Sequence, residues 1–147
     1  MSDKIILPVQ YKIESIRWQG QFVSVGGQDG TTIVGNQKII GGTQTWKVKH
    51  DPSTGMVTFQ GVQGSYPGEE GKYIALGEEG MLVYSDEASW FRLVKLPTVT
   101  DAFMVEDSKY SIDFFNGWHL HNDQDGCPVT LNNILLPGGE WKLIPVF

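Results

Sequence analysis

The sequence predicts an all-β protein made of three similar units. A segment that starts with glycine, alternates apolar with other residues and ends in an acidic residue followed by glycine occurs three times, at 20–30, 71–80 and 117–126. Alternation with period two is typical of strands. An acidic–glycine pair is typical of hairpin turns, because glycine adopts positive φ without a steric penalty. Helix signals are almost absent, since the best candidate covers only 86–89.

A second, independent marker recurs in the same order. Trp46, Trp90 and Trp141 each stand near the end of a unit, before a short apolar alternation. One unit of four short strands cannot bury its apolar face alone, whereas three units closing about an axis remove the exposed sheet edges. We therefore predict a β-trefoil, with twelve strands in three pseudo-threefold repeats forming a six-stranded barrel capped by three hairpins. A propeller is the rival architecture, but three blades fall below its usual number.

The first unit, approximately 5–52, contains a β-branched run at 31–34 that fits a pleated surface better than a helix. The other segments of this unit alternate apolar and polar residues, as half-buried strands do. We expect strands at 11–16, 22–25, 31–34 and 45–48, a turn at 17–20 and a loop at 35–38.

The second and third units, approximately 53–97 and 98–147, follow the same plan. A turn at 51–55 opens the second unit, and a glycine-rich excursion at 61–71 separates its first two strands. We expect strands at 56–59, 73–76, 81–84 and 89–93 in the second unit, and at 109–112, 118–121, 128–131 and 140–144 in the third.

Composition limits the function classes. The chain has 147 residues, one domain by length, with 40% hydrophobic and 19% charged residues. Its net charge is −6 and its bases are not clustered, which argues against nucleic acid as a partner. No stretch has the length of a signal peptide or a membrane span, so we expect a cytoplasmic protein without a membrane partner. Cys127 is the only cysteine, which excludes an intrachain disulfide and favours a buried structural role.

Catalysis has little support in the sequence. Three histidines are present, and none belongs to a nucleophile elbow, a phosphate-binding loop or a zinc-protease motif. We expect a protein that is not an enzyme and that needs no cofactor.

His119 and His121 are the one pattern that suggests a metal site. They alternate along a predicted strand next to Asp123 and Asp125, so two imidazoles and a carboxylate lie within reach of one another. The same alternation turns their apolar neighbours inward and both imidazoles toward solvent. We favour this second interpretation and expect no metal.

Carbohydrate binding is one functional hypothesis, because β-trefoil lectins bind sugars near their hairpins with an aspartate, an aromatic ring and an amide. Their repeat marker is Gln-x-Trp, which here survives only as Gln44-Thr-Trp46. The other units read Ala88-Ser-Trp90 and Gly139-Glu-Trp141. We otherwise expect these three tryptophans to be core residues at the bottom of the barrel. The candidate sugar-binding residues are Asp29, Asp123 and Asp125 as acceptors, with Trp18 or Tyr84 for stacking.

The chain also resembles the mushroom β-trefoil serine protease inhibitors, the mycospins. The resemblance lies in 20–25 with Asp29, then Asn36-Gln-Lys38-Ile-Ile and Thr45-Trp46-Lys-Val. It continues in Lys109-Tyr-Ser-Ile-Asp, Gly117-Trp118, Pro128-Val129, Pro137 and Glu140-Trp141-Lys-Leu, and so covers nearly the whole chain in spaced form.

This resemblance implies that an exposed, substrate-like loop enters the active-site cleft of a serine protease. In the family the hairpin loop of the first unit is one such loop, which here is 26–30 and contains neither arginine nor lysine. A rigid loop keeps the ordering cost of binding low, and one anchor residue carries much of the affinity. The inhibitory-loop candidates are Gly26, Gly27, Gln28, Asp29, Asn36, Lys38 and Lys109. We take protease inhibition as the first hypothesis and a lectin as its alternative, with a storage or interaction protein as a third possibility.

Overall fold

The computed structural model describes residues 10–26, 31–37, 44–62, 71–107, 116–133 and 137–146. These residues form thirteen strands and one short 3-10 helix. None of the described helices is long and apolar enough to cross a membrane. The elements are β1 (Gln10–Ser15), β2 (Phe22–Gly26), β3 (Thr32–Asn36), β4 (Trp46–His50), β5 (Met56–Gly61), β6 (Tyr73–Leu76), η1 (Glu78–Gly80), β7 (Leu82–Ser85), β8 (Phe91–Lys95), β9 (Ala102–Asp107), β10 (Asn116–His119), β11 (Cys127–Pro128), β12 (Thr130–Asn133) and β13 (Trp141–Pro145).

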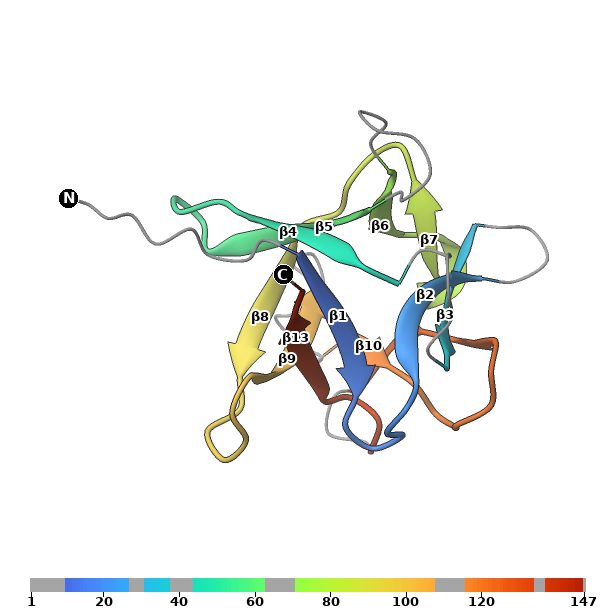
Figure 1. The fold of residues 1–147 in the computed structure, drawn as a ribbon. Coiled ribbons are helices and arrows are strands. Elements are labelled where there is room, and N and C mark those ends of the chain that lie inside the picture. The colour runs from blue at the N-terminus through green and yellow to red at the C-terminus, as the bar shows by residue number, and fades with distance from the viewer. Residues whose placement is uncertain are drawn as a thin grey trace.

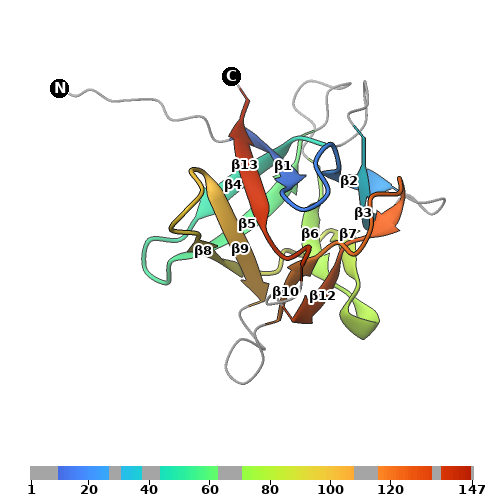
Figure 2. The ribbon, with the colours of Figure 1, turned by 90° about the horizontal axis from the view of Figure 1, so that it is seen from below.

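Six strands close into a barrel. Antiparallel pairing runs from β1 to β4, β5, β8, β9 and β13, and β13 pairs with β1 again. Figure 1 and Figure 2 show these strands from the side and from below. A closed ring leaves no barrel edge unpaired, which explains how a chain of short strands is stable without long ones.

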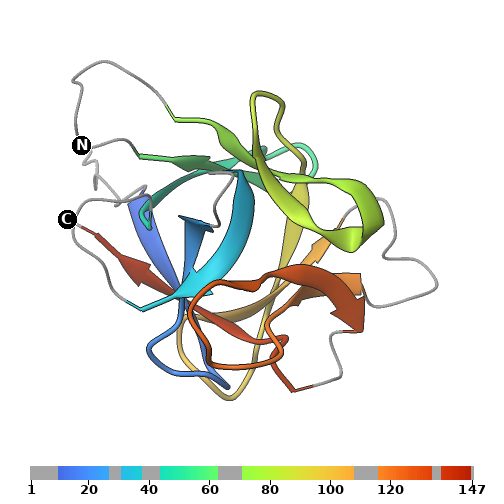
Figure 3. The same cartoon turned by 90° about the vertical axis from the view of Figure 1, so that its right-hand side faces the viewer.

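Three hairpins cap the barrel, one from each unit: β2–β3, β6–β7 and β10–β12 (Figure 3). They also pair with one another, through β3 with β7, β11 with β3, and a bridge between Met81 and Thr130. The return strand of the third hairpin is interrupted at Val129, so twelve predicted strands appear as thirteen segments. The predicted architecture of three four-stranded units is confirmed.

The closing strands of the three units start with Trp46, Phe91 and Trp141, whose side chains are fully buried. The core location predicted for Trp46 and Trp141 is therefore confirmed. The same prediction for Trp90 is wrong, because this residue lies just before β8 and is 40% exposed. The pairing of Val57 with Phe91 in the barrel turns Phe91 inward, and alternation then turns Trp90 outward.

The buried indoles repeat the same hydrogen bond. Nε1 of Trp46 donates to the carbonyl oxygen of Val23 at 2.9 Å, and Nε1 of Trp141 donates to that of Trp118 at 3.0 Å. Both bonds join a closing strand to the second strand of its own unit. Phe91 has no N–H group and cannot form this bond. All three units therefore bury an aromatic ring at the start of the closing strand, but only the first and third units have the hydrogen bond.

Two strand assignments differ from the prediction. The third unit begins with β9 at Ala102–Asp107, while the predicted first strand at 109–112 lies outside the described residues. A tight turn with Asp101 at φ 61° joins β8 to β9, and the two strands pair over five residues. In the first unit, Gly35 and Asn36 belong to β3 and not to a loop, because they pair with Val23 and Phe22.

The acidic–glycine turns behave as predicted where the structure describes them. Glu79 and Gly80 have φ of 57° and 76°, and the backbone N of Met81 donates to the carbonyl oxygen of Glu78 at 3.0 Å. Positive φ at both central residues is the conformation of a type I′ hairpin turn. Gly126 also has a positive φ, of 87°. The turn at Asp29 lies outside the described residues.

Candidate functional site

The loop at 120–126 of the third unit packs against the first unit. The backbone N of Gly126 donates to the carbonyl oxygen of Gly35 at 2.8 Å. Nε1 of Trp18 donates to the carbonyl oxygen of Leu120 at 2.8 Å. These bonds form a ledge between two units that are far apart in sequence. We call the group of Trp18, Gln21, Gln37 and Asp125 on this ledge the Asp125 site.

Asp125 is the acidic residue of this site. Its Oδ1 accepts two hydrogen bonds, from Nε2 of Gln21 at 3.1 Å and from the backbone N of Gln37 at 3.0 Å. The residue is exposed, and within the described ranges neither an ion pair nor a hydrogen bond to Oδ2 is formed. One carboxylate oxygen is therefore fixed by the protein, while the group retains acceptor capacity for a ligand, since an ionised carboxylate has about four lone-pair sites.

Gln21 positions Asp125 from beneath. Its side chain is only 3% exposed, and its Oε1 is buried without a hydrogen-bond partner among the described residues. A Cβ atom at Gly35 would lie 2.9 Å from Cδ2 of Leu120 and 3.2 Å from Oε1 of Gln21. Glycine at position 35 thus allows the close approach of the two units. The buried amide of Gln21 therefore acts by orienting Asp125.

Trp18 contributes an aromatic ring to the same ledge. The backbone N of Gln21 donates to the carbonyl oxygen of Trp18 at 3.1 Å, which links the ring to the amide that holds Asp125. The guanidinium carbon of Arg17 lies 4.9 Å from the centre of the Trp18 ring. This cation–π contact places an exposed cation beside the ring, so the ledge offers a donor as well as an acceptor.

The other predicted sugar-binding residues are placed differently. Asp123 is exposed in the same loop, two positions before Asp125. Tyr84 lies on β7 and packs edge-on against Trp46, with their ring centres 6.0 Å apart. Asp29 lies outside the described residues. Tyr84 and Trp18 both pack against the core, and Trp18 is linked to Asp125 only through its hydrogen bonds with Leu120 and Gln21.

Sequence reasoning missed Gln21, Gln37 and Gln44. The side chain of Gln44 is buried, and its Nε2 donates to the carbonyl oxygen of Gln37 at 2.7 Å. Gln37 in turn donates its backbone N to Asp125. The single Gln-x-Trp motif was the available signal, because its glutamine fixes the segment that holds the carboxylate.

Two of the predicted inhibitory-loop residues are described. Gly26 is the last residue of β2, opposite Thr32, and Asn36 is the half-buried last residue of β3, opposite Phe22. A Cβ atom at Gly26 would collide with Cγ2 of Val34. Both positions are held by strand pairing. The remaining candidates, Gly27, Gln28, Asp29, Lys38 and Lys109, lie outside the described residues.

The two histidines of β10 and its following loop do not share an environment. His119 is only 5% exposed, and its Nε2 lies 2.7 Å from the carbonyl oxygen of Pro137. The predicted solvent exposure of His119 is wrong, because the turn at Pro137 and Gly138 covers it and binds the backbone N of Leu120 at 3.0 Å. His121 is exposed as expected, with Nδ1 3.7 Å from Sγ of Cys127.

The residues that the structure describes contain no group of three or more His, Cys, Asp and Glu side chains suited to a metal ion. His119 is turned away toward Pro137 and His121 lies beside Cys127. Cys127 itself is buried and free, in agreement with the structural role predicted for it.

No family model and no curated protein sequence matches the chain, but solved structures do. The Rhizoctonia solani agglutinin matches with a TM-score of 0.75 and 20% identity, over 99% of this chain and 100% of that one. The chain is a β-trefoil. A Macrolepiota procera ricin B-like lectin in complex with lactose has a TM-score of 0.73 and 16% identity, covering 98% of this chain and 100% of the lectin.

A further similar structure is SeviL bound to asialo-GM1 saccharide, with a TM-score of 0.68 and 12% identity over 95% of this chain and 99% of that one. At such identities the likeness establishes the β-trefoil fold. These three structures do not support the resemblance to mushroom protease inhibitors. They do support the similarity of this chain to the broader group of β-trefoils to which fungal lectins belong.

Proposed function

We propose that this protein is a carbohydrate-binding β-trefoil, a lectin, and that it binds a saccharide at the Asp125 site. The observation that carries the proposal is the fixed carboxylate of an exposed residue. Oδ1 of Asp125 is held by Gln21 and Gln37 at 3.1 and 3.0 Å, on a ledge that also presents Trp18.

The chemistry of this site suits sugar hydroxyl groups. A carboxylate accepts hydrogen bonds from two neighbouring hydroxyls, and bonds to a charged acceptor are stronger than neutral ones. The exposed part of the half-buried Trp18 ring adds an apolar surface for a sugar ring, and the Arg17 guanidinium over this indole adds hydrogen-bond donors. Because Asp125 is already oriented by the protein, little conformational entropy is lost when the ligand binds.

The surviving Gln-x-Trp motif supports the same site. Gln44 is buried and holds Gln37, and Gln37 holds Asp125. In the other two units, the residues two positions before the buried aromatic are Ser89 and Gly139. Gly139 has no side chain, and that of Ser89 is too short to replace the glutamine. We infer a single binding site of this type per chain, next to the first unit.

Two of the similar structures carry saccharides, lactose and asialo-GM1 saccharide, which favours a glycan as the partner. Protease inhibition stands on the sequence resemblance alone, and no contact of the described residues favours it. A protease assay therefore belongs in the test as the competing outcome.

The test is a glycan array followed by calorimetric titration of lactose and of the array hits. We expect the natural protein to bind at least one glycan. Asp125→Asn should weaken that binding by about 10- to 100-fold, as expected for loss of a charged acceptor. Asp86→Asn is the matched control, because Asp86 is an exposed carboxylate with only a 3.9 Å contact to Lys72.

A blank array would overturn the proposal, as would full binding by Asp125→Asn. Trypsin, chymotrypsin and subtilisin are titrated in parallel with the same preparations. Stoichiometric inhibition of one of them, together with a blank array, would establish the competing function.

A further inference from the structure

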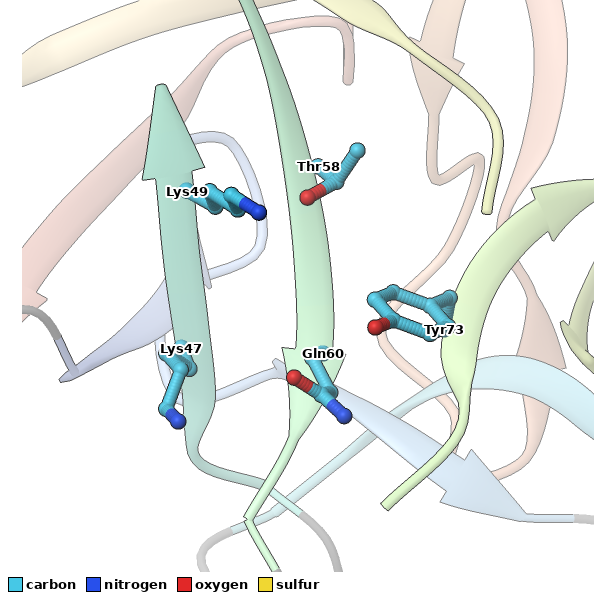
Figure 4. Close-up of a pocket in the computed structure, with 5 residues that line it drawn as sticks. All are labelled: Lys47, Lys49, Thr58, Gln60 and Tyr73. Atoms are coloured by element: carbon cyan, nitrogen blue, oxygen red, sulfur yellow. The ribbon is translucent and has the colours of Figure 1, made fainter. Parts of the chain in front are cut away.

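A pocket of about 260 Å³ lies on the outer face of the barrel, over β4, β5 and β6 (Figure 4). It belongs to a different part of the fold from the Asp125 site, which is built from β1–β2, the end of β3 and the loop at 120–126. Its lining residues are Lys47, Lys49, Thr58, Gln60 and Tyr73.

Strand pairing brings these side chains together. Lys47 lies opposite Gln60 and Lys49 opposite Thr58 on the antiparallel pair β4–β5, while Gln60 also lies opposite Tyr73 on β6. Residues two apart on a strand share a face, so the two lysines point to the same side, about 7 Å apart along β4. Figure 4 shows both lysine side chains along β4, with Gln60 and Tyr73 across from them.

The charge of this pocket is not compensated within the described residues. Neither Lys47 nor Lys49 forms an ion pair there, whereas Lys72 lies 3.9 Å from Asp86 and Arg92 lies 3.8 Å from Glu106. None of the five lining residues is acidic. Two adjacent like charges repel each other, so an anion between them is favourable. This local cationic site occurs in a chain whose net charge is −6.

The neutral groups of the pocket add a second kind of recognition. Nε2 of Gln60 donates to the carbonyl oxygen of Gly71 at 2.9 Å, which fixes the amide and leaves its Oε1 as an acceptor. Thr58 contributes a hydroxyl group, and half-buried Tyr73 contributes a ring with a hydroxyl group. An inorganic anion such as sulfate accepts hydrogen bonds from the ammonium and hydroxyl groups, but it has no hydrogen to donate to Oε1 of Gln60 and no apolar face for the ring of Tyr73. A sugar ring that carries hydroxyls and an anionic substituent uses all of these groups.

We propose that this pocket binds an anionic saccharide, with Lys47 and Lys49 contacting its sulfate or carboxylate group and Gln60 and Tyr73 contacting its ring. The site is independent of Asp125, and this inference stands whether or not the Asp125 site binds neutral sugars.

The test is titration of the full chain with a heparin-derived hexasaccharide, its desulfated counterpart and sodium sulfate. We expect the sulfated hexasaccharide to bind, with an affinity that falls as salt rises because the charges are solvent-exposed. Lys47→Gln with Lys49→Gln should lower the affinity by about tenfold or more. Tyr73→Ala should lower the affinity for the sulfated hexasaccharide but leave the salt dependence of that affinity unchanged.

The matched control is Lys95→Gln with Lys142→Gln, which removes the same charge from exposed positions on β8 and β13. This control should bind within about twofold of the natural protein. Equal losses in the two double variants would overturn the proposal, since net charge alone would then explain binding. Equal affinity for sodium sulfate and the hexasaccharide, or no hexasaccharide binding, would overturn it too. Thermal unfolding of each variant confirms that it is folded.

Discussion

The indole nitrogen of Trp18 donates a hydrogen bond of 2.8 Å to the carbonyl oxygen of Leu120, 102 positions further along the chain. This bond joins the first unit to the third at the edge of the Asp125 site. The site exists because the closed β-trefoil brings a turn near the start of the chain against a loop near its end. Changes to this contact should affect both stability and ligand binding.

Trp18→Phe should retain the ring and lose the donor. We expect the free energy of unfolding to fall by about 0.5–1.5 kcal/mol, the usual contribution of such a bond. Binding of any glycan found at the Asp125 site should weaken as well, since the loop at 120–126 loses an anchor. Urea unfolding and calorimetry measure the two effects. Trp90→Phe is the control, because Trp90 is exposed and should tolerate the change.

The aromatic that closes the second unit is Phe91 and not Trp90. Phe91→Ala should lower the free energy of unfolding by about 3–5 kcal/mol, because its ring is fully buried against Phe59 and Trp118 at 6.1 and 5.2 Å. Trp90→Ala should cost about 1 kcal/mol or less. Chemical denaturation of both variants decides between them, and a larger loss at Trp90 would contradict the register of β8.

Gly35→Ala tests the close approach between units. The added methyl group would meet Leu120 and Gln21, so we expect a loss of stability of about 1–3 kcal/mol. Glycan binding should weaken too, because Gln21 positions Asp125. Leu120→Ala combined with Gly35→Ala should lose less stability than the sum of the two single changes, which a double-mutant cycle measures. Strict additivity would show that the two residues do not meet.

Asp51 should make stability depend on pH. Hydrogen bonds from Oγ and the backbone N of Ser53, at 2.8 and 2.9 Å, hold the pKa of Asp51 below its ordinary value of 3.8. A lowered folded pKa stabilises the native state above pH 3.8, and this stabilisation is lost as pH falls through the folded pKa.

Asp51→Asn should therefore be less stable than the natural protein at neutral pH, with the difference shrinking in acid. Urea unfolding at a series of pH values measures it. Ser53→Ala removes the hydrogen bond from Oγ and keeps the one from the backbone N, so it should reduce the pH dependence by less than Asp51→Asn does. A difference that grows as pH falls below 3.8 would contradict the assignment.

Trp90 shows a limit of predicting burial from a sequence pattern. The run Ser89-Trp90-Phe91 has two adjacent aromatics, and either fits an inward position of a strand. The register of β8 against β5, with Phe91 opposite Val57, selects Phe91 for the core. A shift of one residue reverses the face of every side chain on a strand, so this choice depends on pairing with a distant segment.

His119 illustrates a second kind of limit. Alternation with Trp118 predicted an exposed imidazole, which assumes that one face of β10 meets solvent. Both side chains are buried, because the turn at Pro137 and Gly138 covers the other face. Local periodicity predicts the face of the strand on which a residue lies, but segments distant in sequence determine whether that face is exposed to solvent.

Local features were sufficient for the architecture: period-two alternation, acidic–glycine turns and three recurring aromatics are short-range properties that strand and turn geometry translate directly into three units. They also singled out Asp125 and Trp18. Chain closure was needed for the site itself, since Gln21 and Gln37 reach Asp125 only when the first and third units meet, and Gln44 holds Gln37 within the first unit. Hydrogen bonds between segments about a hundred residues apart leave no periodic trace in a sequence, which is why the aspartate was visible there and its support was not.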